Sequence, residues 1–461
     1  MNFFKNYFFL LIMLLIQFIK LNTQGITSII NGNSNNGINT YYITLYFGEQ
    51  KNSKTFLMDT SGSLTSYKCN LDSSNNEKDI IKCQNNSACN NYPYSSCVDN
   101  KCQFEYNYYN SMSKGIYTNQ SISFSGNGQS HIFPIGCIKS ETNDFLSKSS
   151  DGILGLKMND NSFLELLYKE KMIFKKQFSI CLNQKEGGYL YFGEINEDYH
   201  YDKNNNIKNI IINYIPFNTL ENGIYLLEIN SLYIEQMQNL FSEGEKQNGI
   251  IDTLSVKTYL KESLYINLIN EFLNYCLKEK GNCHNIQKID NLGYCSNFKS
   301  KQEIIKSINK YWPKLIIGFN GYNHILSPEN YFIAYSSDGK INACIGFEKT
   351  DKNYNILGTN ILKGYNTIFD NDNKKIGFVK SDCEIEEKKE KNFESEQYIN
   401  RVFDDPVNVI IVCASFGGII ILIILLIILY RLFYKKTPKR KGYTRQVDVV
   451  NSINSYLENQ K

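Results

Sequence analysis

Two stretches of this chain end an apolar run with the same pair of residues, and this repetition constrains the fold more than any other feature of the sequence. In the first, FLMDTSGSLTSYKC, the run stops at Asp59 and Thr60 and then turns. In the second, GIIDTLSVKTYL, it stops at Asp252 and Thr253. Aspartate and threonine are common in turns and caps, so a single pair would deserve no functional interpretation. Two pairs in matching settings indicate two halves that each bring one acid to a shared site.

The rest of the central region predicts a mainly β protein in two lobes. A chain of 461 residues is long enough for two domains with buried cores. Short apolar runs broken by Asn, Gly and Ser predict strands, for example at 40–48, 115–126, 187–195 and 376–383. Helical patterns are fewer, around 161–172 and 263–277. A polar stretch without periodicity, residues 198–209, separates an expected N-terminal lobe (25–204) from a C-terminal lobe (205–383).

Both ends of the chain are hydrophobic and predict targeting and anchoring segments. Residues 1–24 have the pattern of a secretory signal peptide, with an uncleaved anchor as the alternative. Residues 407–430 carry no charge and are long enough for a tilted transmembrane helix. An acidic stem (384–406) precedes this span and a basic tail (431–461) follows it, which places the tail in the cytosol. We therefore expect a single-pass type I membrane protein of the secretory pathway, with its main region luminal or extracellular.

The cysteines predict disulfide bonds. The chain has 13 cysteines, of which Cys413 lies in the predicted span. The other twelve are an even number in an expected oxidising compartment, and this favours disulfides. Five cluster within 69–102, yet there is no C-x-x-C pair and there are only four histidines, so we expect no metal site. Their pairing cannot be read from the sequence. The twelve candidates are Cys69, Cys83, Cys89, Cys97, Cys102, Cys137, Cys181, Cys276, Cys283, Cys295, Cys344 and Cys383.

Two N-x-S sequons make Asn85 and Asn119 candidate glycosylation sites. They are consistent with a luminal region. They are weak signals on their own, because the chain is rich in Asn and Ser.

The two turn acids suggest a specific chemistry. If Asp59 and Asp252 face each other in a semi-buried site, like charges prevent both from ionising easily, so one proton is shared. Such a pair can activate a water as general base while the protonated partner donates to a carbonyl oxygen. Paired carboxylates of this kind are an established catalytic pattern for metal-free hydrolysis. No cofactor is required.

With these residues the chain resembles the pepsin-like aspartic proteases over nearly all of residues 40–383. The segment SSDGILGLKMN closely matches the family's DGILGL segment, and NILGTNILKGYNTIFDNDNKKIGFVKSDC resembles the close of its second lobe. Cys69 lies ten residues after Asp59 and Tyr259 seven after Asp252, a spacing similar to that of the nepenthesin-like branch. The Cys-rich insertion and the C-terminal span resemble the membrane-anchored plasmepsins and beta-secretase. The resemblance implies a mainly β, bilobal fold with a central cleft and a catalytic Asp59/Asp252 dyad.

The family places a flap tyrosine on a hairpin over the cleft. The corresponding stretch here is FEYNYYNSMSKGIY. Counting back from Gly115 puts Tyr108 in the flap position, whereas Tyr106 or Tyr109 takes it if the register slips. A tyrosine that merely packs is the alternative in a chain with 34 tyrosines.

The chain departs from the family motif Asp-Thr/Ser-Gly-Ser/Thr. Both acids and both supporting threonines are present, but the glycine is replaced by Ser61 in the first turn and by Leu254 in the second. The outer hydroxyl becomes Gly62 in the first turn and is retained as Ser255 in the second. A Cβ in a glycine-only conformation costs on the order of 1–3 kcal/mol, and one lost donor raises the barrier by about 2.7–4 kcal/mol. We therefore expect strained turns and slower catalysis, with Leu254 the more disruptive substitution.

Three functions are compatible with these features. The favoured one is a membrane-anchored aspartic endopeptidase acting on proteins or peptides as a monomer. The alternatives are a pseudoprotease whose cleft binds partners without cutting them, and a surface receptor on the same scaffold. Nucleic acid is not an expected partner, because the net charge is +3 and no basic stripe crosses the central region.

Overall fold

The computed structural model describes most of the chain between Gly25 and Glu384. The described ranges are 25–33, 40–69, 79–108, 111–142, 150–184, 187–193, 195, 200–202, 207–208, 211–220, 223–278, 283, 286–289, 292–337 and 340–384. The predicted signal peptide, transmembrane helix and basic tail, and all but the first residue of the acidic stem, lie outside these ranges. Within these ranges, no helix is long and apolar enough to span a bilayer.

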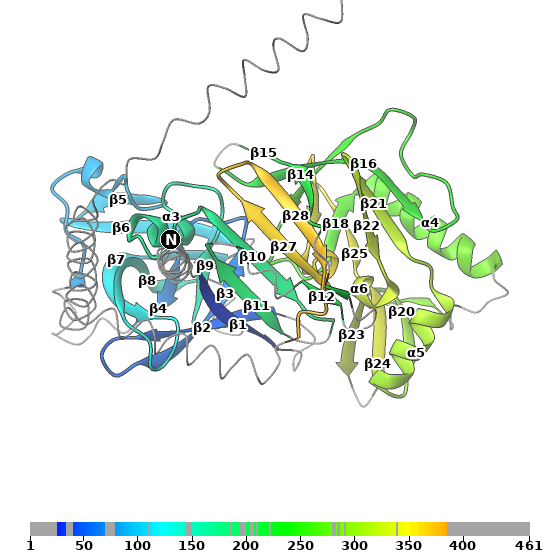
Figure 1. Ribbon diagram of the computed structural model, residues 1–461, viewed down its shortest axis with the longest axis horizontal. Coiled ribbons are helices and arrows are strands. Elements are labelled where there is room, and N and C mark those ends of the chain that lie inside the picture. Colours follow the sequence, from blue (N-terminus) through cyan, green and yellow to red (C-terminus); the bar gives the residue numbers. More distant parts are fainter. Residues whose placement is uncertain are drawn as a thin grey trace, which may run out of the picture. The chain divides into compact units, whose positions relative to one another are not determined.

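One large sheet runs from the N-terminal half of the chain into the C-terminal half (Figure 1). Its strand order is β14-β28-β27-β10-β11-β1-β2-β3-β9-β4-β8-β7-β6-β5. In chain order its strands are β1 (Ile26–Asn33), β2 (Thr40–Phe47), β3 (Asn52–Asp59), β4 (Ser66–Lys68), β5 (Ser95–Val98), β6 (Lys101–Tyr108), β7 (Ser111–Ser123), β8 (His131–Glu141), β9 (Gly152–Gly155), β10 (Gln177–Leu182), β11 (Gly188–Phe192), β14 (Asn213–Pro216), β27 (Tyr365–Asp370) and β28 (Lys375–Lys380).

The C-terminal half adds two smaller sheets, and a short hairpin lies at the predicted lobe boundary. One sheet contains β15 (Asn218–Thr219), β16 (Tyr225–Ile234), β17 (Gln247–Ile251), β18 (Thr258–Lys261), β21 (Leu315–Phe319), β22 (Tyr322–Leu326), β25 (Phe347–Thr350) and β26 (Asn355–Leu357). The other contains β19 (Gln287–Ile289), β20 (Gly293–Phe298), β23 (Phe332–Ser337) and β24 (Lys340–Ile345). The hairpin pairs β12 (Tyr201–Asp202) with β13 (Ile207–Lys208).

Helices are few in the described ranges. They are η2 (Asn86–Cys89), α3 (Phe163–Lys169), α4 (Glu262–Lys278), α5 (Lys301–Tyr311), α6 (Pro328–Tyr331) and η4 (Thr359–Ile361). The predicted helices at 161–172 and 263–277 correspond to α3 and α4. Helix α5 was not predicted, although Ser300 caps it by accepting a hydrogen bond from the Glu303 N–H at 3.2 Å, the capping pattern that marks a helix start.

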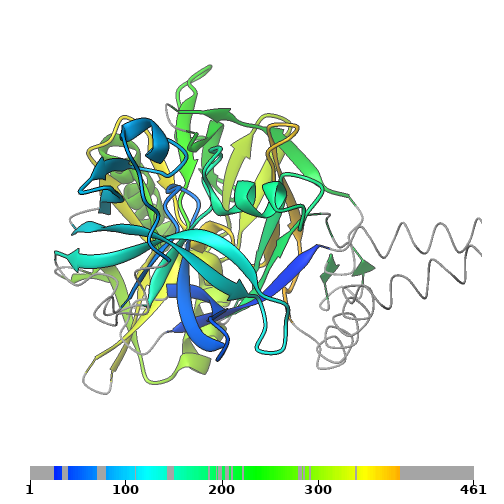
Figure 2. The same cartoon turned by 90° about the vertical axis from the view of Figure 1, so that its left-hand side faces the viewer.

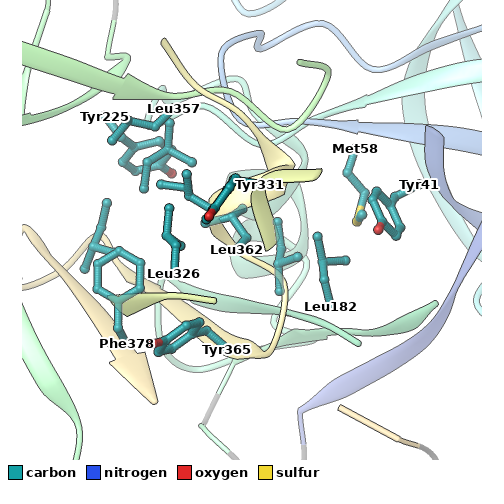
Figure 3. Packing of buried hydrophobic residues seen from close by; sticks show 14 of the residues in the cluster. Tyr41, Met58, Leu182, Tyr225, Leu326, Tyr331, Leu357, Leu362, Tyr365 and Phe378 are labelled. Atoms are coloured by element: carbon teal, nitrogen blue, oxygen red, sulfur yellow. The ribbon is translucent and has the colours of Figure 1, made fainter. Parts of the chain in front are cut away.

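Strand β2 shows how the sequence builds this core. Its side chains alternate between partly exposed and buried, with Tyr41, Ile43, Leu45 and Phe47 all on the buried face. These residues belong to one apolar cluster that continues into the C-terminal half. Figure 3 shows residues of both halves within it, among them Met58 and Tyr331. The mainly β fold predicted from the sequence is therefore confirmed.

The last strands of the described region return to the first half. Strand β27 pairs with β10, and β28 pairs with β14 (Figure 1). Phe178 on β10 stacks on Phe369 on β27 with ring centroids 4.5 Å apart. The two halves are thus joined by a shared sheet, and the lobe boundary at residue 204 stays a prediction.

All twelve cysteines predicted to form disulfides are paired. The bonds are Cys69–Cys137, Cys83–Cys97, Cys89–Cys102, Cys181–Cys383, Cys276–Cys283 and Cys295–Cys344. Three sulfurs, those of Cys83, Cys89 and Cys102, lie within 4.8 Å of one another, but each is bonded to another sulfur. The strands of this Cys-rich region, β5 and β6, lie toward the viewer in Figure 2.

Both sequon asparagines are accessible. Asn85 precedes η2, where its side chain accepts a hydrogen bond from the Ala88 N–H, and Asn119 is exposed on β7. Their glycosylation stays a prediction.

Candidate active site

Each turn acid lies at the end of a strand with the same kind of neighbours. Strand β3, which ends at Asp59, pairs with β2 antiparallel and with β9 parallel. Strand β17, which ends just before Asp252, pairs with β16 antiparallel and with β26 parallel. The two matching phrases of the sequence therefore have matching topology, as the sequence predicted.

The parallel neighbours, β9 and β26, carry a second repeat that the sequence interpretation missed. Strand β9 ends in Ile-Leu-Gly at Gly155, and β26 ends in Ile-Leu with Gly358 as the next residue. A Cβ on Gly155 would lie 2.4 Å from the carbonyl carbon of Ser63, and one on Gly358 would lie 2.6 Å from the carbonyl oxygen of Ser255. Each glycine therefore lets its strand approach the adjacent acid-bearing turn. The repeated Ile-Leu-Gly tripeptide could have revealed these two positions from the sequence.

The two threonines hold the turns together by a reciprocal exchange. The Thr60 N–H donates to Thr253 Oγ1 and the Thr253 N–H donates to Thr60 Oγ1, both at 3.1 Å. Each hydroxyl then donates to the opposite strand, Thr60 to the Ile251 carbonyl at 2.8 Å and Thr253 to the Met58 carbonyl at 2.7 Å. Both side chains are buried, so these bonds replace lost hydration and fix the turns relative to each other.

With the turns held in this way, both acids lie close to the hydroxyl group of Ser61. Ser61 Oγ lies 2.8 Å from Asp59 Oδ1 and 3.3 Å from Asp252 Oδ1. Asp59 is fully buried and Asp252 is 4% exposed, whereas Ser61 is partly exposed. The structure thus brings together the two acids, both threonines, Ser61 and Ser255, whose hydroxyl donates to Asp252 Oδ2 at 2.8 Å.

Comparisons with known proteins agree with this geometry. Family models described as xylanase inhibitor N-terminal and xylanase inhibitor C-terminal match residues 41–194 and 224–380. Together they cover both turns and more than half of the chain. The chain belongs to the pepsin-like aspartic protease family.

Several family members can be compared directly with this chain. Plasmepsin V of Plasmodium falciparum (isolate 3D7) is 24% identical over 430 residues, covering 74% of this chain and 71% of that protein. Plasmepsin VII of P. falciparum (isolate NF54) is 29% identical over 268 residues, covering 50% and 54%. Aspartic proteinase-like protein 1 of Arabidopsis thaliana is 23% identical over 252 residues, and this chain spans only 43% of its length. The crystal structure of basic 7S globulin from soybean shares the fold, with a TM-score of 0.59, 19% identity and coverage of 78% of this chain and 95% of that one.

The strain expected from the altered family motif is absent. Neither Ser61 nor Leu254 is among the residues with positive φ, so a Cβ is tolerated at both positions. The donors are also retained, because the Ser61 N–H reaches Asp59 Oδ1 at 2.9 Å and the Leu254 N–H reaches Asp252 Oδ1 at 3.0 Å. The expectation of strained turns with a lost donor was therefore wrong.

In the first turn the position without room for a side chain is Gly62, one residue after the position of the family's motif glycine. A Cβ there would lie 2.1 Å from Asp59 Oδ2 and 2.9 Å from Asp59 Cγ. The Gly62 N–H donates to Asp59 Oδ1 at 2.8 Å. In the first turn, glycine and hydroxyl have thus exchanged places relative to the family motif.

The Leu254 side chain packs against the first half of the protein. It contacts an apolar cluster of the first half that includes Leu57, Leu64 and Phe104. Tyr106 packs against the same cluster. The isobutyl group therefore helps to join the second turn to the first half of the protein.

Tyr106 is the tyrosine on β6 that approaches the dyad. Its hydroxyl lies 3.0 Å from the point that a Cβ on Gly62 would occupy. Burial, followed by the negative charge of Asp59, raises the pKa of Tyr106 far above its ordinary value. The side chain of Tyr108 lies outside the described residues, so its flap role stays a prediction, and the alternative register with Tyr106 has direct geometric support.

The environments of the two acids differ. Burial, followed by the negative charge of Asp252, raises the pKa of Asp59 from 3.8 to about 7, against the opposing hydrogen bonds from Ser61 and Gly62. Asp59 Oδ2 is buried and has no hydrogen-bond partner among the described residues, whereas Ser255 supplies a hydroxyl to Asp252 Oδ2. Asp59 is therefore suited to hold a proton near neutral pH.

Proposed function

We propose that this protein is an aspartic endopeptidase that hydrolyses peptide bonds through the Asp59/Asp252 dyad. The main support is that Oδ1 of both acids lies within 3.3 Å of the Ser61 hydroxyl, in turns joined by the hydrogen bonds between the two threonines. Family membership supports the same chemistry. Thr60, Thr253 and Ser255 serve as positioning residues in this proposal.

The proposed reaction gives the acids different roles. Asp252, which accepts hydrogen bonds from Ser255 and Leu254, is the general base. Asp59, whose raised pKa keeps it protonated below about pH 7, donates its proton to the carbonyl oxygen of the substrate. Peptide cleavage should therefore decline as the pH rises through about 7.

A cleavage assay on the full-length protein in detergent tests the proposal. We expect the wild type to cleave a mixed peptide library below pH 7, and Asp59→Ala and Asp252→Ala to abolish cleavage. Ser150→Ala is the matched control, because its hydroxyl bonds the Gly152 carbonyl outside the site. Cleavage that survives loss of either acid would contradict the proposal.

A pseudoprotease is the second candidate, and the names of the matching families favour it. Both family models are described as xylanase inhibitor domains. A cleft that binds a protein partner without cutting it would show no turnover at any pH. Partner capture would then survive Asp59→Ala and Asp252→Ala, which is also the outcome expected for a receptor.

We propose further that residues 407–430 anchor the protein in a secretory-pathway membrane. The six disulfides of the described region support an oxidising compartment. The expected result is that the protein resists alkaline extraction from membranes and that deletion of 407–430 releases it. Extraction of the intact chain would contradict anchoring.

A further inference from the structure

The two acids of the dyad differ in the hydroxyl group available to their Oδ2 atoms. In the second turn, the Ser255 hydroxyl donates to Asp252 Oδ2 at 2.8 Å. In the first turn, Gly62 holds the corresponding place, and Asp59 Oδ2 is buried with no hydrogen-bond partner among the described residues. A buried carboxylate oxygen without a donor is costly once it carries charge, so the first turn needs a donor from elsewhere in the chain.

The Tyr106 hydroxyl lies beside this oxygen. The point that a Cβ on Gly62 would occupy is 2.1 Å from Asp59 Oδ2 and 3.0 Å from the Tyr106 hydroxyl, so both groups border the place of the missing side chain. Three titratable groups act on this hydroxyl, those of Asp59, Tyr94 and Asp252. Burial and then the charges of these groups raise the pKa of Tyr106 far above its ordinary value, so its hydroxyl stays protonated and able to donate.

A second tyrosine holds Tyr106 in this position. Tyr94, in the turn before β5, packs its ring on that of Tyr106 with the centroids 4.2 Å apart, and the two hydroxyls form a hydrogen bond. The Glu105 N–H donates to the Tyr94 carbonyl at 3.3 Å, which fixes this turn to β6. Tyr94 has a φ of 58°, a conformation that bulky side chains rarely adopt. Such strain persists only where the surrounding structure requires it, and it clusters at functional positions.

We propose that Tyr106 supplies Asp59 with the hydroxyl that the first turn lacks, and that Tyr94 positions Tyr106 for this task. This inference rests on the proposed peptidase function and adds a pair of positioning residues to it. When Asp59 gives its proton to the substrate, its carboxylate becomes negatively charged, and the Tyr106 hydroxyl donates to Oδ2 directly or through one bound water. Tyr106 thereby stabilises the ionised form of Asp59 and limits the rise in pKa that burial causes.

The pH dependence of peptide cleavage by the full-length protein in detergent tests this role. Without the donor, the pKa of Asp59 should rise further, so Asp59 stays protonated to higher pH and is a weaker acid toward the substrate. For Tyr106→Phe we expect the decline in kcat/KM near pH 7 to move up by about 0.5–1 pH unit and kcat below pH 7 to fall about tenfold. Tyr94→Phe should move the decline in the same direction by less, and the double variant by no more than Tyr106→Phe alone.

Tyr92→Phe is the matched control for these variants. Tyr92 belongs to the same Cys-rich region, but its ring packs on Tyr117, with the centroids 4.9 Å apart. We expect this variant to keep the pH dependence of the wild type. An equal shift in Tyr92→Phe would contradict a specific role of the pair Tyr94 and Tyr106.

A second measurement requires no cleavage. The urea midpoint of the wild type relative to Asp59→Asn should decline as the pH rises to about 7, where the folded protein loses the proton of Asp59. With Tyr106→Phe present in both proteins, the same difference should go on declining to higher pH, because the folded state then keeps this proton longer.

The outcomes separate this inference from the peptidase function. If Tyr106→Phe raises KM alone and leaves both pH dependences unchanged, the tyrosine only contacts the substrate, and the inference is overturned while the peptidase function stands. If the wild type cleaves no peptide at any pH, the peptidase function is overturned. The urea measurement then still decides whether Tyr106 acts on Asp59: an extended decline supports this role, and an unchanged one refutes it.

Discussion

At the scale of single residues, the first turn differs from the family motif by an exchange of neighbours. Ser61 contributes a hydroxyl that faces both acids, and Gly62 leaves Asp59 Oδ2 without the donor that Ser255 gives to Asp252. The exchange is compatible with the fold because the backbone at Ser61 does not require glycine. What the exchange alters is the hydrogen bonding of Asp59, and these hydrogen bonds from Ser61 and Gly62 oppose the rise of its pKa.

Gly62→Ala tests the close approach of the turn to Asp59. The new methyl carbon would lie 2.1 Å from Asp59 Oδ2, so the carboxylate must leave its donors. We expect the free energy of unfolding to fall by about 1–3 kcal/mol and cleavage to fall at least tenfold. Gly126→Ala is the matched control, because its methyl group would meet Tyr46 at an ordinary 3.6 Å. Equal effects of the two variants in urea unfolding and cleavage assays would contradict the close approach.

The raised pKa of Asp59 predicts a pH-dependent stability. The unfolded chain releases this proton above its ordinary pKa of 3.8, whereas the folded protein retains it up to about pH 7. Between these values the folded state binds more protons, so the free energy of unfolding declines as pH rises. Relative to Asp59→Asn, the urea midpoint of the wild type should fall from pH 3.8 to pH 7. A constant difference across this interval would refute the assignment of the proton to Asp59.

At the scale of elements, the sequence predicted what depends on local pattern. The alternating burial along β2 and the two Asp-Thr turns could be predicted, because a strand's buried face and a turn's polar residues are set by neighbours in the chain. The conformation at Ser61 and the packing of Leu254 could not be predicted, because both depend on contacts between distant segments. The sequence also could not decide which tyrosine of β6 lies beside the acids, because side chains two residues apart on a strand lie on the same face.

The β6–β7 hairpin yields a direct comparison of two tyrosines. Tyr106 lies beside the dyad, and its partner in the register is Ser113, whereas Tyr108 pairs with Ser111 nearer the hairpin end. We expect Tyr106→Phe to lower kcat/KM more than Tyr108→Phe, because the Tyr106 hydroxyl lies 3.0 Å from the point that a Cβ on Gly62 would occupy, beside Asp59. A larger loss for Tyr108→Phe would restore the register counted from the sequence.

At the scale of the whole described region, the two halves depend on each other through the sheet that β27 and β28 complete. The disulfide Cys181–Cys383 ties the end of this sheet to β10 across 202 residues of sequence. Closing a long loop restricts the unfolded chain more than closing a short one. The disulfide and the strand pairings of β27 and β28 therefore join segments of the two halves that are far apart in the sequence.

Removal of a long-range and a short-range disulfide separates these contributions. We expect Cys181→Ser/Cys383→Ser to lower the free energy of unfolding by about 2–5 kcal/mol. Cys276→Ser/Cys283→Ser, whose bond spans only 7 residues, should cost less. Urea unfolding of both double variants measures the difference, and an equal or greater loss for the short bridge would contradict this account.

If Asp59 and Asp252 act as one unit, both should be needed to bind a peptide that mimics the tetrahedral intermediate. We predict that the wild type binds such a hydroxyl-containing mimic about 100-fold or more tightly than Asp59→Asn or Asp252→Asn. The double variant should bind no more weakly than either single variant, because each substitution alone breaks the unit. Equal affinity of wild type and variants, or losses that add in the double variant, would contradict a shared dyad.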